Sequence, residues 1–484
     1  MNNKLFDQQN LSVVEFVVKP EEFTQEVKSK KYLVAEESCD GFFETLQGKL
    51  RNRENSGSLN PEDLRLDMSD CKLVFKSLNI LGEYYPEHKH IKYYKQTPKT
   101  LEIVKIHERF HAIHHLMPDP DKNGSKWDDF ADIDSFYLEL LAQLFTFIYI
   151  QDFDETLMSD FEDLNREQPL IYKTYKIFRH YNMDQAEELY WAIREKNLNN
   201  FEYKLLVKIF NNMRIKAINN AVFDGIRKTI NRFREQPFLY FTESDIHASL
   251  SKDIMDGSSD ILILGNTAVE RKSIKTPVSL VHHEFPTNFR YEKKKLKDGY
   301  DDENLNLTAI SSAHGDRGNY DLAVLNPVFI EKLFESHKKE GLIEILKHII
   351  NKDLNRAINR IPDEELIYAI EVKFVHMFND RNINMLEEVK SDNEKLRLAL
   401  HHKHCTKAIN LFFCSSAEKE RRDIQQPVIR QIKEYIESFY NQDIINIFIE
   451  SFIDLDSSVK KTTKPKFSKN QQGWSDLINV IVRP

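Results

Sequence analysis

The sequence predicts an α+β protein of several domains, in which a helical middle section separates two parts of mixed α and β structure. A chain of 484 residues has room for two to four domains. The stretch 154–235 carries apolar residues at three- and four-residue spacing and no cluster of Pro or Gly, which is typical of helices. After it, short apolar runs alternate with helical segments, which favours an α/β core. We therefore expect domains at 1–153, 154–235 and 236–484.

The bulk composition narrows the classes of protein. The net charge of −9 gives no global electrostatic reason to bind nucleic acid, so any such site must be a local patch. The four cysteines show no C-x-x-C spacing, which argues against a disulfide framework and fits a reducing cytosol. The N-terminus has no signal-peptide pattern, and no apolar run reaches the 18 residues of a membrane-spanning helix. We expect a cytoplasmic protein with no membrane partner.

In the N-terminal part, local patterns predict a strand at Ser12–Val18, a helix at Phe42–Arg51 and a β-hairpin over residues 81–94. A helix should follow over about 97–116, because apolar residues recur at helical spacing and Pro118 comes directly after it. A second, strongly apolar helix is expected over residues 136–145.

The string His107-Glu108-Arg109-Phe110-His111 lies in the first of these two helices. Histidines at i and i+4 share one helix face and can both reach one zinc ion, and Glu108 then lies beside the position where zinc binds water. Catalytic zinc takes three protein ligands. Glu139 is the candidate for the third, since a carboxylate in an apolar helix is costly unless it is paired or bound to metal. A surface position for Glu139 is the alternative.

Through the order of hairpin, H-E-x-x-H helix and Glu-bearing helix, residues 70–150 resemble zinc metallopeptidases of the gluzincin type. The resemblance implies a zincin-like fold, zinc held by His107, His111 and Glu139, Glu108 as the general base, and a protein or peptide substrate. It also implies that the strand His90–Tyr94 is a peptide-binding edge.

Four side chains near the string are available to stabilise an oxyanion, and the sequence does not choose among them. They are Tyr84, His114, His115 and Tyr137. We interpret His114 and His115 as residues of the helix surface rather than as metal ligands.

In the C-terminal part, acidic residues accompany predicted strands. The strands are expected at Leu262–Leu264, Val278–His283, Tyr320–Leu325, Ile367–Phe374 and Ala408–Cys414. Asp321 begins one apolar strand, while Glu371 and Lys373, two residues apart, project to one face of another. Carboxylates can hold Mg²⁺ for phosphodiester cleavage, and a lysine can position the attacking water. Glu243 adds an acid near the start of a helix that Thr242 can cap.

These features resemble the PD-(D/E)xK nuclease superfamily, over residues 238–455. The resemblance implies an α/β restriction-endonuclease-like core and a DNA substrate. It further implies that Asp321, Glu371 and Lys373 form the catalytic site, that Asp321 and Glu371 bind Mg²⁺ or Mn²⁺, and that Glu243 assists. The chain departs from the pattern by placing about 50 residues between Asp321 and Glu371.

A competing Asp…Glu-x-Lys set consists of Asp260, Glu270 and Lys272, with hairpin spacing. We favour the later set because Ile367–Phe374 is more apolar and so better suited to a central strand. Solvated strand ends with a surface Glu–Lys pair are the alternative for both sets.

Three charged segments receive a plainer interpretation. Asp392, Glu394 and Lys395 are expected on a solvated helix face. The run 401–405 (His-His-Lys-His-Cys) is expected to be a basic turn or phosphate-contacting patch, because adjacent ligands rarely converge on one ion. The basic segment 460–466 is expected to be a mobile tail.

Together the patterns predict a bifunctional hydrolase, with a zinc peptidase joined to a Mg²⁺-dependent DNA nuclease. We interpret it as a bacterial antiviral-defence or toxin effector in which proteolysis controls the nuclease. One alternative is a zinc peptidase whose nuclease-like domain is inactive and binds DNA or a partner. Another is a structural zinc site in an interaction protein. The oligomeric state is left open.

Overall fold

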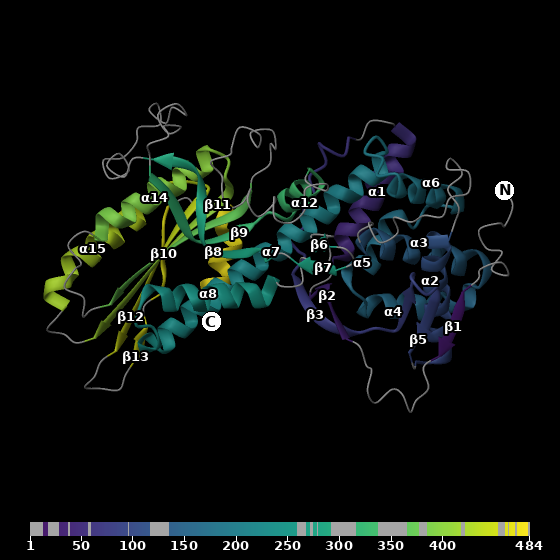
Figure 1. Ribbon diagram of the computed structural model, residues 1–484, viewed down its shortest axis with the longest axis horizontal. Helices are drawn as coiled ribbons and strands as arrows, with labels where there is room; N and C mark the ends of the chain where they lie inside the picture. The colour runs from purple at the N-terminus through teal and green to yellow at the C-terminus, as the bar shows by residue number, and fades with distance from the viewer. Residues whose placement is uncertain are drawn as a thin grey trace. The chain divides into compact units, whose positions relative to one another are not determined.

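The computed structural model forms two compact units, one built mainly from residues 1–217 and the other mainly from residues 218–484 (Figure 1). The structure describes residues 13–17, 29–36, 39–56, 60–94, 96–116, 135–258, 268–271, 274–277, 279–291, 316–336, 365–376, 385–417, 422–453, 460–462, 464–469 and 472–482. It contains helices and several sheets, as the predicted α+β class requires.

The first unit contains a small sheet whose described strands run in the order β1-β5-β4. Strand β4 (Gly82–Tyr85) pairs antiparallel with β5 (His90–Tyr93), which confirms the predicted hairpin. Strand β1 (Val14–Val17) pairs with the other side of β5. The expectation that residues 90–94 form an edge is therefore wrong, because a strand from the start of the chain covers it. The outer strands of this sheet, among the described residues, are β1 and β4.

Two long helices follow the hairpin along the chain, and both match the predicted segments. Helix α2 (Pro98–Leu116) buries one face of the H-E-x-x-H string. Helix α3 (Ser135–Phe153) is buried almost throughout, as its apolar sequence requires. Helix α1 (Asp40–Ser56) and a two-stranded sheet of β2 (Ser29–Ala35) and β3 (Leu73–Asn79) complete the N-terminal part.

Cys39 and Cys71 form a disulfide in the first unit. The argument against a disulfide framework is therefore wrong for this pair, while Cys405 and Cys414 are buried and form no disulfide with a described residue. Disulfide formation depends on distance in space, and the spacing of Cys39 and Cys71, 32 positions apart, does not show that they are close.

The middle section is helical, as the apolar periodicity predicted. It consists of η3 (Glu155–Leu157), α4 (Met158–Glu167), α5 (Leu170–Lys173), η4 (Thr174–Phe178), α6 (Met183–Arg194) and α7 (Phe201–Glu235). Helix α6 begins with a capping box between Asn182 and Gln185, which satisfies two backbone N–H groups. The division between the two compact units falls within α7, after Ala217.

The second unit is built on a seven-stranded mixed sheet. Its strands are β8 (Val281–Tyr291), β9 (Asp316–Leu325), β10 (Leu366–His376), β11 (Cys405–Ala417), β12 (Ile444–Ile453), β13 (Lys460–Thr462) and β14 (Lys466–Phe467). The first three pair antiparallel, and β10, β11 and β12 pair in parallel. Four predicted strands are confirmed here. The fifth, Leu262–Leu264, lies outside the described residues.

Helices complete the second unit. They are η5 (Pro237–Leu239), α8 (Glu243–Ser258), α12 (Pro327–Ser336), α14 (Met385–His401), α15 (Arg422–Ser438), η9 (Gln472–Trp474) and α16 (Ser475–Val482). Helices α14 and α15 lie along one face of the sheet and provide the crossovers between its parallel strands (Figure 1). The expected mobile tail is wrong for β13 and β14, because the backbone of β12 pairs with both.

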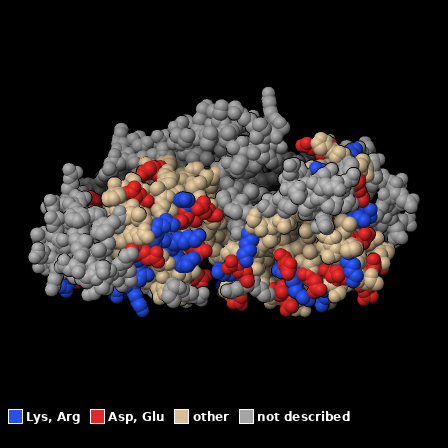
Figure 2. Space-filling view, turned by 90° about the horizontal axis from the view of Figure 1, so that it is seen from below, with Lys and Arg blue, Asp and Glu red and all other residues tan. Residues whose placement is uncertain are grey.

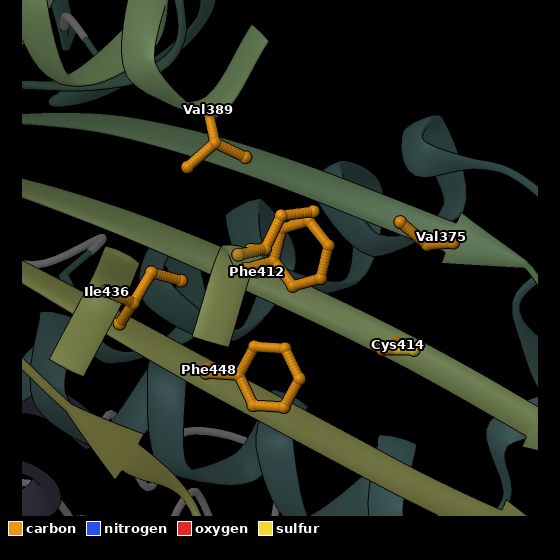
Figure 3. Close-up of a cluster of buried hydrophobic side chains, with 7 residues drawn as sticks. Val375, Val389, Phe412, Cys414, Ile436 and Phe448 are labelled. Atoms are coloured by element: carbon orange, nitrogen blue, oxygen red, sulfur yellow. The ribbon is translucent and has the colours of Figure 1, made fainter. Parts of the chain in front are cut away.

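The core under α14 and α15 is an apolar cluster on one face of the sheet (Figure 3). Phe412 of β11 stacks on Phe448 of β12, with ring centroids 5.5 Å apart. Its neighbour Phe413 points to the opposite face, where it contacts Phe233 of α7. The sheet is therefore covered on both faces, which explains the apolar character of its central strands.

Replacing Phe412 by Ala should lower the free energy of unfolding of the second unit by about 3–5 kcal/mol, because the cavity left by the ring cannot fully close. Urea unfolding followed by circular dichroism would measure the change. Tyr440→Ala provides the control, since that ring is 71% exposed and its removal should cost less than about 0.5 kcal/mol. Equal midpoints for the two variants would contradict this account of the core.

Candidate metal centres

The three side chains predicted to bind zinc converge in the first unit. The Nε2 atoms of His107 and His111 lie 3.2 Å apart, one helical turn from each other on α2. Glu139 of α3 places its Oε2 atom 3.1 Å from the first Nε2 and 3.2 Å from the second. Both histidines are 7% exposed. Two imidazoles and a carboxylate are the donor set of many catalytic zinc sites, so the three residues fit such an ion.

The electrostatics of this centre favour an ionised carboxylate. Burial by itself would raise the pKa of Glu139, but the imidazole of His111 and hydrogen bonds from both histidines outweigh it and hold the pKa well below the usual range. The Tyr172 hydroxyl also donates a hydrogen bond to Glu139 and is itself hydrogen-bonded to Tyr32. Burial raises the pKa of both tyrosines, so their hydroxyls stay protonated and can donate.

Glu108 lies on the same helix with its carboxylate turned toward strand β4. Burial raises its pKa to about 8, and the nearby carboxylates of Glu139 and Glu83 act in the same direction. The Tyr84 backbone N–H donates to it. A Cβ at Gly82 would lie 2.8 Å from Glu108 Cγ and 2.9 Å from Oε1. Only glycine allows the strand to approach the carboxylate this closely.

A cavity of about 600 Å³ opens onto the centre. Strand β4, the end of β3 and helices α2 and α3 contribute to its walls, together with Tyr32 and Tyr172. The candidate ligand atoms therefore face a space large enough for a peptide segment.

The structure separates the four side chains considered as oxyanion donors. His114 is 1% exposed and stacks on Tyr190, so its expected surface position is wrong. Tyr137 packs against Phe210, whereas Tyr84 lines the cavity and lies 2.8 Å from His115 Nδ1. Tyr172 contacts His107, with ring centroids 5.5 Å apart, and Tyr32 also lines the cavity. Neither tyrosine was predicted from the sequence, because both lie far from the string along the chain.

A second group of possible metal ligands lies in the second unit. His247 Nε2 of α8 is 4.0 Å from Glu243 Oε1 and 3.7 Å from Asp321 Oδ2 of β9. His247 is 9% exposed, and its Nε2 atom has no hydrogen-bond partner among the described residues. The predicted acids Glu243 and Asp321 are thus brought together, and the histidine between them was not predicted from the sequence. One imidazole and two carboxylates can hold a divalent transition ion.

Backbone hydrogen bonds fix the two acids of this centre. Asp321 Oδ2 accepts from the N–H of Val372, and Glu243 Oε2 accepts from the N–H of Phe374. Burial nevertheless raises the pKa of Glu243, and the charge of Asp321 adds to the effect. A bound cation would favour the ionised forms of both carboxylates.

Glu371 and Lys373 of β10 lie beside this triad. Glu371 is 1% exposed, and its Oε1 atom is 2.7 Å from Lys395 Nζ of α14. Burial raises the pKa of Glu371 well above its usual range despite this lysine. Lys373 Nζ lies 3.6 Å from Glu243 Oε1 and 3.6 Å from Asp392 Oδ2. The structure therefore places the predicted lysine at the triad and pairs Glu371 with a second lysine. A ligand role for Glu371 stays a prediction.

The expected solvated face of α14 is wrong for Asp392 and Lys395. Both side chains are buried, at 9% and 8% exposure, and Lys395 also donates to the Asn319 carbonyl. Strand β10 supplies the opposite charges that stabilise these groups when they are buried, a contact between elements that helical periodicity does not show.

The competing set finds less support. Glu270 lies on β6 (Ala268–Arg271), which pairs with β7 (Ile274–Pro277) in a separate two-stranded sheet. Asp260 and Lys272 lie outside the described residues. Asp321, Glu371 and Lys373 of the favoured set lie on the large sheet.

The expected basic turn at residues 401–405 is wrong for His404, which is fully buried. Its Nε2 atom is 2.8 Å from Glu365 Oε2, and its Nδ1 atom is 3.0 Å from the Tyr320 hydroxyl. His401 and Lys403 are exposed. On the surface shown in Figure 2, acidic and basic side chains are interspersed over the described residues.

Comparisons with protein-family models, curated proteins and solved structures find no match for this chain. Among the described helices, none combines the length and the apolar character needed to cross a bilayer.

Proposed function

We propose that the first unit is a zinc-dependent peptidase. The observation that carries the proposal is the convergence of His107, His111 and Glu139 beside the buried Glu108, on the wall of the 600 Å³ cavity. A zinc ion held there would polarise a scissile carbonyl and lower the pKa of its bound water.

The roles of the surrounding residues follow from their positions. Glu108 acts as the general base, taking the proton of the attacking water and passing it to the leaving amine. The backbone N–H of Tyr84 and the close packing of Gly82 hold its carboxylate in place. The Tyr172 hydroxyl already donates to Glu139, so Tyr32, which lines the same cavity, is the candidate donor for a developing oxyanion.

For the second unit we propose a metal-dependent DNA nuclease. The specific observation is the convergence of Glu243, His247 and Asp321 with the ammonium group of Lys373. Lys373 stays protonated because Asp392 and Glu243 raise its pKa against the opposing effect of burial. The lysine can therefore hold a phosphate oxygen or an attacking water beside the bound ion.

Two sites in one chain suggest a controlled effector, in which proteolysis licenses the nuclease. We propose that such an effector acts in antiviral defence or as a toxin. The alternative proposal is a peptidase whose nuclease-like unit only binds DNA or a partner. If Glu108→Gln left the nuclease activity of the full chain unchanged in cells, the result would contradict the proposal that proteolysis controls the nuclease.

Metal content and plasmid cleavage test the two activities separately. Elemental analysis should find about one tightly bound zinc per chain, lost in His111→Ala. Plasmid incubated with Mn²⁺ or Mg²⁺ should be nicked by the wild-type chain and by Asp260→Ala, but not by Asp321→Ala. Absence of nicking under every condition would favour the binding role of the second unit.

Replacing Gly82 by Ala should reduce peptide cleavage by about 100-fold while zinc stays bound. The added methyl would meet Val104 Cγ1 at 2.6 Å and Glu108 Cγ at 2.8 Å, so the carboxylate must move, and a displacement of about 1 Å can cost that factor. Gly48→Ala is the control, since its Cβ would meet no atom within 4 Å. Full activity in Gly82→Ala would show that the strand does not position Glu108.

A further inference from the structure

Acidic and basic side chains alternate in a chain of ion pairs beside the second metal centre. Lys373 Nζ lies 3.6 Å from Glu243 Oε1 and 3.6 Å from Asp392 Oδ2. Asp392 Oδ1 lies 3.6 Å from Lys395 Nζ, which lies 2.7 Å from Glu371 Oε1. Glu243 belongs to the possible metal ligands of this centre, whereas Asp392 and Lys395 do not.

The sequence spacing brings these charges to one interface between helix α14 and strand β10. Asp392 and Lys395 are three residues apart and so share one face of the helix. Glu371 and Lys373 are two residues apart and so share one face of the strand. Each face carries one acid and one base. Asp392 and Lys395 are buried, so water and salt screen their charges only weakly.

Helix α14 is anchored on the sheet, which fixes the position of Asp392. Val389, three residues before it, is fully buried in the apolar cluster of Figure 3. Lys395, three residues after it, donates to the carbonyl of Asn319, two residues before Asp321 on β9. The carboxylate is therefore held in place relative to the strand that supplies an acid of the metal centre.

The Oδ2 atom of Asp392 has no hydrogen-bond partner among the described residues. A buried carboxylate oxygen is costly without compensation, and the ammonium of Lys373 provides the opposite charge. Burial opposes the charge of Lys373, and Asp392 raises the pKa of the lysine more than Glu243 does. Asp392 is therefore the stronger electrostatic partner of the lysine.

Metal binding would make this partner more important. With Glu243 engaged by a cation, the same positive charge would repel the ammonium of Lys373. Asp392 is then the acid that remains within ion-pair distance of the lysine.

We propose that Asp392 is a positioning residue of the second centre, which holds the ammonium of Lys373 beside the metal ligands. Lys395 supports it by pairing with Asp392 and by tying α14 to β9. The proposal rests on the proposed nuclease function and adds a residue to it. Since Asp392 acts through the lysine, its removal should matter only while Lys373 is present.

A double-mutant cycle on plasmid cleavage by the full chain with Mn²⁺ tests the proposal. Asp392→Asn should lower kcat by about 10- to 100-fold, with KM unchanged, because a displaced functional group costs that factor. Lys373→Met should lower kcat by about 100- to 1,000-fold. The double variant should match Lys373→Met within a factor of about two, whereas independent losses would multiply.

Metal affinity provides a measurement that does not depend on cleavage. Calorimetry with zinc in the first centre should show that Asp392→Asn weakens Mn²⁺ binding by less than about 10-fold, in contrast to the loss of a metal ligand. Urea unfolding of the same preparations checks that each variant is folded. If Asp392→Asn alone is unstable, the comparison of the double variant with Lys373→Met decides, because the double variant leaves no lysine unpaired.

Glu388→Gln is the matched control, since Glu388 is exposed on the same helix and its charge should not affect cleavage. Multiplied losses in the double variant, or full activity in Asp392→Asn, would overturn the proposal and leave the nuclease standing. Loss of Mn²⁺ binding in Asp392→Asn would make Asp392 a metal ligand and overturn its positioning role. Absence of cleavage by the wild-type chain would overturn the nuclease and the proposal with it.

Discussion

Glu108→Gln should reduce peptide cleavage by about 10²- to 10⁴-fold, the contribution of a positioned general base. Glutamine keeps the size of the side chain and can still accept the hydrogen bond from the Tyr84 N–H, but it cannot take a proton from water. Since Glu108 does not belong to the converging triad, zinc should stay bound at about one ion per chain. The rate constant for a fluorogenic peptide and the zinc content should be measured on the same preparation.

A matched control lies on the same helix. Glu102 is half exposed, pairs with Lys105 at 3.5 Å and lies one turn and a half before Glu108. Glu102→Gln makes the same substitution on α2 and should leave the rate within a factor of about two. Loss of zinc from Glu108→Gln would show that the residue supports the metal site rather than proton transfer.

The sequence predicted the first centre well because its chemistry is local. The two histidines are four residues apart on one helix, and Glu139 is conspicuous in a helix that is otherwise buried. The tyrosines that complete the centre lie on β2 and α5, and no spacing rule connects them to the string. The edge strand was misassigned for the same reason, because β1 reaches β5 from the start of the chain.

The second centre could be predicted from the sequence only in part. Apolar runs marked the central strands, but they could not show that α14 buries Asp392 and Lys395 against β10. The omission of His247 was avoidable. Glu243 and His247 are four residues apart on one helix face, the same relation that identified the histidines of α2. A search for metal-binding pairs at i and i+4, rather than for one motif, would have found it.

His247→Ala should weaken metal binding at the second centre by at least about 100-fold, since loss even of a group that only orients a ligand costs about 10- to 100-fold. DNA cleavage should fall with it. An imidazole ligand also favours transition ions over Mg²⁺, which prefers oxygen ligands. The wild-type chain should therefore cleave DNA at lower concentrations of Mn²⁺ than of Mg²⁺, and His247→Asp, with oxygen ligands only, should reduce that difference.

Pulsed electron paramagnetic resonance of bound Mn²⁺ separates ligation from activity. Measured with the first centre filled by zinc, the wild-type spectrum should contain a ¹⁴N coupling from the imidazole, and His247→Asp should lose it while still binding Mn²⁺. The buried His404 is the matched control, because its two nitrogens are engaged by Glu365 and Tyr320 and His404→Gln should keep the coupling. A ¹⁴N coupling that persists in His247→Asp would assign the metal to other ligands. Retained coupling without DNA cleavage would instead support a second unit that binds metal and DNA without cutting.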